Sequence, residues 1–162
     1  MAETTFTAYE ALEIALEMED DGIVFYEAMA QAAPQPELQE LARQLADAER
    51  DHKRRIREMI DAEDYANGWS NEDLLMLDQY VRENLKRDIF PGRAAAEKLS
   101  DRLANLFDGF TLAIGFERQT VDYYQKLHET CTYPTGKEAF GQLVEEEKRH
   151  EALLMEARGK IE

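Results

Sequence analysis

The sequence contains an internal repeat, which constrains the fold more than any other feature does. When residues 19–52 are compared with residues 117–150, at an offset of 98 positions, glutamate, tyrosine and histidine residues coincide. The matched pairs are Glu19 with Glu117, Tyr26 with Tyr124, Glu49 with Glu147, and His52 with His150. One Glu-x-x-His sequence is common by chance in helical proteins. Two copies in one frame, each with a matching upstream Glu and Tyr, indicate that one structural unit was duplicated.

Helical periodicity runs through both copies of the repeat. Apolar residues recur at spacings of three and four, which is typical of amphipathic helices. We predict an all-α protein, one domain over residues 1–162, in which two helical hairpins form a four-helix bundle. The hairpins cover about residues 8–62 and about residues 108–158, and a long, partly helical crossover of about residues 63–107 joins them. A simple up-and-down array of five or six helices is the alternative.

Local signals mark the ends of these helices. Thr7 with Glu10 has the spacing of a capping box at the start of the first helix, and Thr135 with Glu138 has it at the start of the last. Trp69 lies in the turn-rich break after the second helix. We expect its side chain to anchor the crossover on the bundle.

Each glutamate of the repeat lies inside an apolar stripe and not beside one. Glu19, for example, falls between Leu16 and Ile23 at helical spacing. A carboxylate taken into a helical core loses several kcal/mol of hydration free energy unless it is paired. The same stripes contain no lysine or arginine, so four such carboxylates would repel one another.

Metal cations would resolve this repulsion. Two divalent ions carry four positive charges, which balance four carboxylates, and two neutral imidazoles complete the set. A Glu and a His at positions i and i+3 of a helix lie on one face about 5–6 Å apart, so one ion can contact both. Oxygen plus imidazole ligation suits iron or manganese, and zinc can also occupy such a site. The sequence therefore predicts a dinuclear metal site; the alternative is that these residues lie on the surface of an ordinary acidic bundle.

Composition limits the partners and the compartment. The chain has 35 acidic and 19 basic residues and a net charge of -16, which repels phosphate backbones, so we expect no nucleic acid partner. No apolar run approaches the ~20 residues of a membrane span. The N-terminus also lacks the basic start and apolar centre of a signal peptide. We therefore expect a cytoplasmic protein, and with Cys131 as its one cysteine it cannot build a cysteine-based metal site.

The repeated residues resemble those of the ferritin-like diiron-carboxylate proteins, and most closely those of the rubrerythrin group. The resemblance covers both hairpins, about three quarters of the chain, and implies a ferritin-like bundle that holds two iron ions, with manganese or zinc as alternatives. It implies Glu49 and Glu147 as bridging ligands, Glu19 and Glu117 as terminal carboxylates, and His52 and His150 as one imidazole ligand for each metal. Tyr26 and Tyr124 would be phenols hydrogen-bonded to ligand carboxylates, with ordinary aromatic core as the alternative.

The sequence departs from the rubrerythrin pattern in two respects that concern chemistry. One cysteine excludes the rubredoxin-like tail, which needs two Cys-x-x-Cys pairs, so electrons would come from a separate donor protein or from ferrous iron. Peroxide-reducing rubrerythrins carry an extra glutamate three residues after the third-helix ligand, but that position is Thr120 here and Gly22 is its first-helix equivalent. We therefore expect a site of four Glu and two His.

Glu146 directly precedes a bridging glutamate. Related diiron proteins often hold a carboxylate there that orients a ligand histidine. A solvated charge is the favoured interpretation of Glu146 from sequence.

The resemblance implies an oxidoreductase that acts on O2 or hydrogen peroxide. Two other functions stay open: non-enzymatic binding of iron or another metal for storage or delivery, and a bundle that holds zinc for structure alone. We also expect a homodimer, because related proteins often pair through bundle faces.

Overall fold

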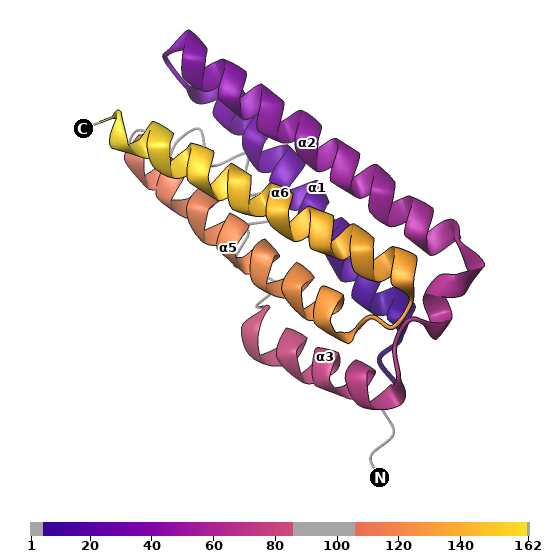
Figure 1. Ribbon diagram of the computed structural model, residues 1–162. Coiled ribbons are helices and arrows are strands. Elements are labelled where there is room, and N and C mark those ends of the chain that lie inside the picture. The colour runs from indigo at the N-terminus through magenta and orange to yellow at the C-terminus, as the bar shows by residue number, and fades with distance from the viewer. Residues whose placement is uncertain (1–4, 86–105, 162) are drawn as a thin grey trace.

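The computed structural model describes residues 5–85 and 106–161 (Figure 1). Within these ranges every regular element is helical. The long helices are α1 (Ala8–Ala32), α2 (Pro36–Asp61), α5 (Leu106–Thr130) and α6 (Pro134–Gly159), and the shorter elements are η1 (Glu63–Asn67) and α3 (Asn71–Asn84). The predicted all-α fold is confirmed.

The four long helices pack as two hairpins. α1 lies along α2, and α5 lies along α6 (Figure 1). Contacts between α2 and α6 and between α1 and α5 join the hairpins into the predicted four-helix bundle. α3 lies beside α5 on the outside of the bundle, so the described part of the crossover is helical as predicted. The remainder of the predicted crossover, residues 86–105, lies outside the described residues.

The ends of the helices follow the sequence signals in part. Thr7 accepts a hydrogen bond from the Glu10 amide at 3.1 Å, and the Glu10 carboxylate accepts one from the Thr7 amide at 2.7 Å, which is the predicted capping box. The predicted capping box of Thr135 is wrong. Helix α6 begins at Pro134, whose fixed φ suits the first helical position, so Thr135 already lies within the first turn.

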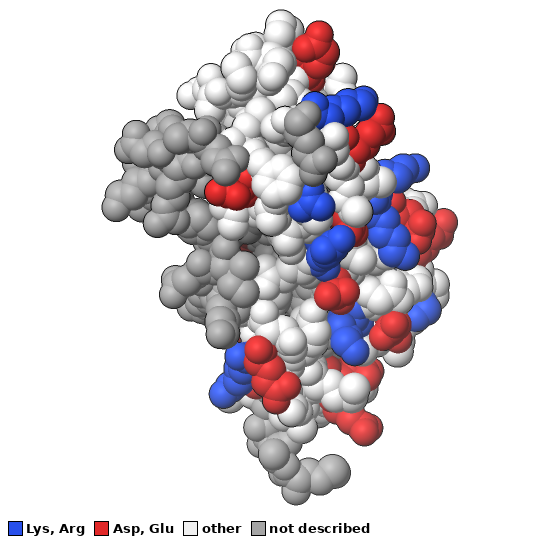
Figure 2. Space-filling view, turned by 90° about the vertical axis from the view of Figure 1, so that its left-hand side faces the viewer, with Lys and Arg blue, Asp and Glu red and all other residues white. Residues whose placement is uncertain are grey.

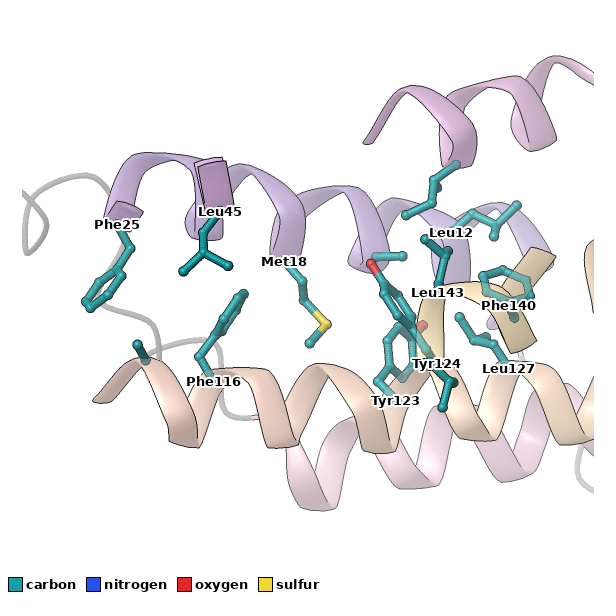
Figure 3. Packing of buried hydrophobic residues seen from close by; sticks show 14 of the residues in the cluster. Leu12, Met18, Phe25, Leu45, Phe116, Tyr123, Tyr124, Leu127, Phe140 and Leu143 are labelled. Carbon is teal, nitrogen blue, oxygen red and sulfur yellow. The ribbon is translucent and has the colours of Figure 1, made fainter. Parts of the chain in front are cut away.

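Large apolar side chains fill the bundle on both sides of the level that carries Glu19. Figure 3 shows Phe25 and Phe116 toward one side of the view, and Leu12 and Phe140 toward the other. Glu19 lies between Leu12 and Phe25 along α1. These close-packed layers hold the helix axes in place and keep water out of the middle of the bundle.

Trp69 fixes the start of the crossover, as the sequence predicted. Its side chain is 7% exposed, its Nε1 donates to Thr130 Oγ1 at 3.0 Å, and its ring centroid lies 6.2 Å from that of Phe140. The amide of Thr132, in the turn between α5 and α6, donates to the Gly68 carbonyl at 2.7 Å. The first hairpin is thereby tied to the turn of the second.

The surface mixes charges of both signs. On the face drawn in Figure 2, acidic and basic side chains interleave in a band beside a broad uncharged area. Arg118 of α5 pairs with Glu151 of α6 at 2.5 Å, for example. Exposed pairs of this kind contribute little to stability. None of the described helices is long and apolar enough to cross a membrane.

The anchoring role of Trp69 predicts a graded loss of stability. Trp69→Ala should lower the free energy of unfolding by about 3–5 kcal/mol, because a large buried ring is lost. Trp69→Phe should lower it by less, about 1–2 kcal/mol, because an aromatic ring is retained while part of the buried volume and one hydrogen bond are lost. Urea denaturation followed by far-ultraviolet circular dichroism measures both. Equal losses for the two variants would contradict the packing role of the ring.

Candidate metal centre

Each long helix contributes one glutamate to the middle of the bundle. The four are Glu19 of α1, Glu49 of α2, Glu117 of α5 and Glu147 of α6, and each is at most 1% exposed. They face inward because each lies in the apolar stripe of its helix. His52 and His150 each follow a glutamate by three residues and are also buried. The structure thus brings together all six residues that the resemblance implied as ligands.

The six side chains form two overlapping groups. One group contains Glu19, Glu49, His52 and Glu147, and the other contains Glu49, Glu117, Glu147 and His150. Within each group, one ligand atom from every residue lies within 4.8 Å of the others. Glu49 and Glu147 belong to both groups, as two bridging carboxylates would.

Five polar atoms of this cluster are buried without a hydrogen-bond partner. They are Glu19 Oε2, Glu49 Oε1, Glu117 Oε2, Glu147 Oε2 and His150 Nδ1. A buried acceptor that lacks a partner costs about 1–3 kcal/mol, and more when it is charged. Acceptors that converge on a shared interior space fit cations, and carboxylate oxygens with imidazole nitrogens are common ligands of divalent transition metals. The cluster therefore fits a dinuclear metal site.

Both imidazoles turn Nδ1 toward the carboxylates. His52 Nδ1 lies 3.0 Å from Glu147 Oε1 and 3.3 Å from Glu49 Oε2. His150 Nδ1 lies 2.8 Å from Glu147 Oε2 and 3.6 Å from Glu49 Oε1, which is close enough for electrostatic attraction, although neither contact has the geometry of a hydrogen bond. The two rings are stacked, with centroids 5.4 Å apart and planes 14° apart. Each imidazole can therefore serve the group that contains it through the same ring nitrogen.

The two repeated tyrosines make hydrogen bonds that cross between the hairpins. Tyr26 of α1 donates to Glu117 Oε1 of α5, and Tyr124 of α5 donates to Glu19 Oε1 of α1. All four side chains are buried. Each phenol occupies one carboxylate oxygen and leaves Oε2 of that carboxylate facing the cluster without a hydrogen bond.

The carboxylates do not all have the same proton affinity. Burial, together with the charge of a buried neighbouring carboxylate, raises the pKa of Glu19 and of Glu117 well above the usual range. Burial also acts to raise the pKa of Glu49, but its contacts with Glu19, His150 and His52 outweigh burial and hold the pKa well below the usual range. Without metal, the cluster therefore keeps protons on Glu19 and Glu117.

The imidazoles are shifted toward the charged form. Burial acts to lower the pKa of His52, but hydrogen bonds to Glu147, Glu19 and Glu49 raise it far above its usual value. The pKa of His150 rises to about 9 in spite of burial, because Glu147 and Glu49 stabilise the imidazolium. These protons supply positive charge that metal ions would otherwise provide.

Glu146 is not the solvated charge that the sequence favoured. Its Oε2 lies 2.8 Å from His52 Nε2 and also pairs with the guanidinium of Arg55. Its side chain is only 29% exposed. The histidine and arginine that contact Glu146 belong to the facing helix α2, so the sequence pattern of α6 alone could not show these contacts. In the sequence, the one indication that Glu146 contacts a histidine was its position directly before Glu147.

Thr120 occupies the position at which peroxide-reducing rubrerythrins carry an extra glutamate, so this position adds no carboxylate to the cluster. Thr120 is 1% exposed, and its hydroxyl donates to the Phe116 carbonyl at 3.0 Å. At the equivalent place in α1, a Cβ on Gly22 would lie 3.2 Å from the Phe116 ring and 3.3 Å from Glu49 Cγ. The lack of a side chain at Gly22 thus lets α1 approach Glu49 closely.

A solved structure shares the whole fold. A protein of Thermotoga maritima described as a ferritin-like diiron-carboxylate protein matches with a TM-score of 0.69 and 17% sequence identity, over 100% of this chain and 99% of that chain. At this identity the likeness concerns the fold, and it confirms the ferritin-like architecture. None of the curated proteins that were compared with the sequence matches it.

The family comparison covers the repeat and the crossover alike. The model of the family described as Rubrerythrin matches residues 10–158, a range that contains nearly all of both hairpins and all six clustered residues. Together with the ferritin-like bundle and its buried carboxylate and imidazole cluster, this match shows that the chain belongs to the rubrerythrin family.

Proposed function

We propose that the chain binds two iron ions in this cluster and acts as an oxidoreductase on O2 or hydrogen peroxide. The observation that carries the proposal is the pair of overlapping ligand groups, which share Glu49 and Glu147. One ion would take Glu19 and His52 in addition to the shared pair. The other would take Glu117 and His150.

The donor set is compatible with iron. Four carboxylates and two imidazoles suit iron or manganese, with zinc as a further possibility. The cluster contains no thiolate, since Cys131 lies in the turn between α5 and α6, where its Sγ contacts the Tyr133 carbonyl at 3.6 Å. Four negative charges against two divalent cations would leave the buried site neutral.

Bound iron would supply the electrons, because each ion can alternate between ferrous and ferric states. The protein's own contribution is position and shielding. Glu49 and Glu147 belong to both ligand groups and would hold both ions, and the phenols of Tyr26 and Tyr124 hold Glu117 and Glu19 in one orientation. The nearly complete burial of the four glutamates excludes water, which strengthens every electrostatic interaction inside the site.

Electrons would reach the site from outside the chain. The proposed source is a separate donor protein or ferrous iron. The homodimer expected from the resemblance stays a prediction.

A second function is favoured by one specific observation. Thr120 stands where peroxide-reducing rubrerythrins carry an extra glutamate, and its hydroxyl is already bonded to the Phe116 carbonyl. A site of four glutamates and two histidines is closer to those that oxidise and hold iron. Non-enzymatic iron storage or delivery is therefore the alternative, and zinc held for structure alone is a third outcome.

The bridging role of Glu49 predicts a large loss of metal from one substitution. Purified protein should hold about two metal ions per chain, and Glu49→Ala should hold fewer than one, because both groups lose a ligand. Metal present at about 100 times its dissociation constant should stabilise the wild-type fold by ~2.7 kcal/mol. Elemental analysis and thermal denaturation with and without chelator measure the two effects.

Glu40→Ala is the matched control for Glu49→Ala. Glu40 lies on the same helix, and its side chain is 60% exposed and paired with Arg43. This variant should keep the metal content of the wild type. Equal metal content in all three proteins would refute the assignment of Glu49.

Redox chemistry is tested by loading ferrous iron without oxygen and then admitting an oxidant. Air should produce a ferric-oxo absorption band and oxygen uptake, and hydrogen peroxide with a reductant should be consumed over repeated turnovers. Glu147→Ala should reduce both rates by at least tenfold, since it removes a shared ligand. Oxidation that stops after one equivalent favours storage, and a redox-silent ion that iron does not displace favours the structural role.

The pKa shifts predict opposite pH responses with and without metal. The pKa of His150 is about 9 in the fold against an ordinary value of 6.5. Its contribution to stability is therefore fully present below pH 6.5 and is lost as the pH rises through 9. The raised pKa values of Glu19 and Glu117 act in the same direction, since their neutral forms are favoured.

Chelated protein should therefore lose stability between pH 6.5 and 9.5, whereas the apparent metal affinity should rise over the same range as protons leave the cluster. Denaturation midpoints of the chelated protein and metal titrations across this range measure both trends. Parallel slopes for chelated and loaded protein would contradict the proposal.

A further inference from the structure

We infer that the two halves of the proposed dinuclear site are inequivalent, with the half that contains Glu19 and His52 binding its ion more tightly and filling first. The half that contains Glu117 and His150 is then the weaker, exchangeable one. The inference rests on the proposed function, because it concerns how two ions share the cluster. It follows from residues that differ between the two copies of the repeat, outside the six clustered side chains.

His52 is held from behind by a carboxylate. While its Nδ1 faces Glu147 and Glu49, its Nε2 lies 2.8 Å from Glu146 Oε2. A hydrogen bond from Nε2 to a carboxylate leaves Nδ1 as the atom that binds metal, fixes the plane of the ring and makes the imidazole a stronger base. Partners of this kind commonly change metal affinity by about 10–100-fold when they are removed.

Glu146 is itself fixed in place. The Arg55 guanidinium pairs with Glu146 Oε2, and Arg55 Nε lies 3.1 Å from Asp51 Oδ2. The chain of contacts from His52 through Glu146 and Arg55 to Asp51 therefore orders the carboxylate before a metal arrives. An ordered partner loses less conformational entropy on metal binding than a free side chain would.

The second copy of the repeat lacks this arrangement. At the same offset of 98 positions, Ala48 corresponds to Glu146 and Leu153 corresponds to Arg55. Positions 48 and 146 each directly precede a shared glutamate, and both are half-buried. Alanine cannot accept a hydrogen bond, and Leu153 is 45% exposed. His150 therefore has no carboxylate from the equivalent position of α2.

Exposure differs in the same sense. The His52 side chain is 1% exposed, whereas the His150 side chain is 10% exposed. The attraction between opposite charges weakens where water is closer, because the effective dielectric constant is higher there. The carboxylates would therefore hold the ion beside His150 less strongly than the ion beside His52. Because His150 is the more exposed of the two imidazoles, an ion would enter or leave more easily from its side. Ligand basicity, preorganisation and access all favour the His52 half as the tighter one.

Calorimetric titration of metal-free protein with Co²⁺ tests this directly, since Co²⁺ needs no anaerobic handling. Wild-type protein should bind in two resolved steps. His150→Ala should abolish the weaker step and leave the tighter one, which assigns each step to its half. Glu146→Gln should weaken the tighter step by about 10–100-fold with little effect on the weaker step, because it removes the charge and keeps the side-chain shape.

Ala48→Glu is the reciprocal variant, since it places a carboxylate behind His150 and should strengthen the weaker step. Glu145→Gln is the matched control, because Glu145 neighbours Glu146 but its side chain is 70% exposed and pairs with Lys148. Circular dichroism checks that each variant folds. If Glu146→Gln weakens both steps equally or neither, the inference is wrong while the dinuclear site stands. If wild-type protein binds no Co²⁺, the proposed function itself fails.

Discussion

Mutual repulsion among four buried carboxylates is the constraint on which the rest of this structure depends. Four glutamates from four helices meet in the buried middle of the bundle. Each of them has one carboxylate oxygen that makes no hydrogen bond. Positive charge must compensate them. Protons do so in the metal-free protein, as the raised pKa values of Glu19, Glu117 and His150 indicate. Metal ions in the proposed site would replace those protons, which couples metal binding, pH and stability at one place.

Duplication explains why this cluster is nearly two-fold symmetric. Each hairpin brings one glutamate with its tyrosine and one Glu-x-x-His, and the tyrosine of one hairpin bonds the first glutamate of the other. The four glutamates and two histidines can retain this symmetry because both proposed ions need the same donors. The two copies differ among the residues that contact the clustered side chains. Glu146 of one copy corresponds to Ala48 of the other, and Arg55 corresponds to Leu153. Functional specialisation of the two halves would therefore arise from neighbours of the ligands.

Much of the fold could be predicted because the signals are local. The boundaries of α1 and α2 follow from a capping box at Thr7, a proline at position 36 and unbroken apolar periodicity. The capping box predicted at Thr135 was wrong, because the helix starts at Pro134, two residues earlier than a Thr135 cap requires, and Thr135 therefore lies inside it. The clustering of the six site residues was also predictable. Each long helix has one glutamate in its apolar stripe, and four such stripes can all be buried only by facing one another in the middle of a bundle.

The sequence by itself determined which way each side chain faces, because the 3.6-residue period of a helix fixes the direction of every residue around its own axis. That was enough to direct Glu19, Glu49, Glu117 and Glu147 inward. Only the tertiary structure decided which residues meet across helices, because this depends on how far one helix is shifted along the next. Tyr26 therefore reaches Glu117 and not the glutamate of its own helix, and Glu146 reaches His52 and Arg55 on α2 instead of water.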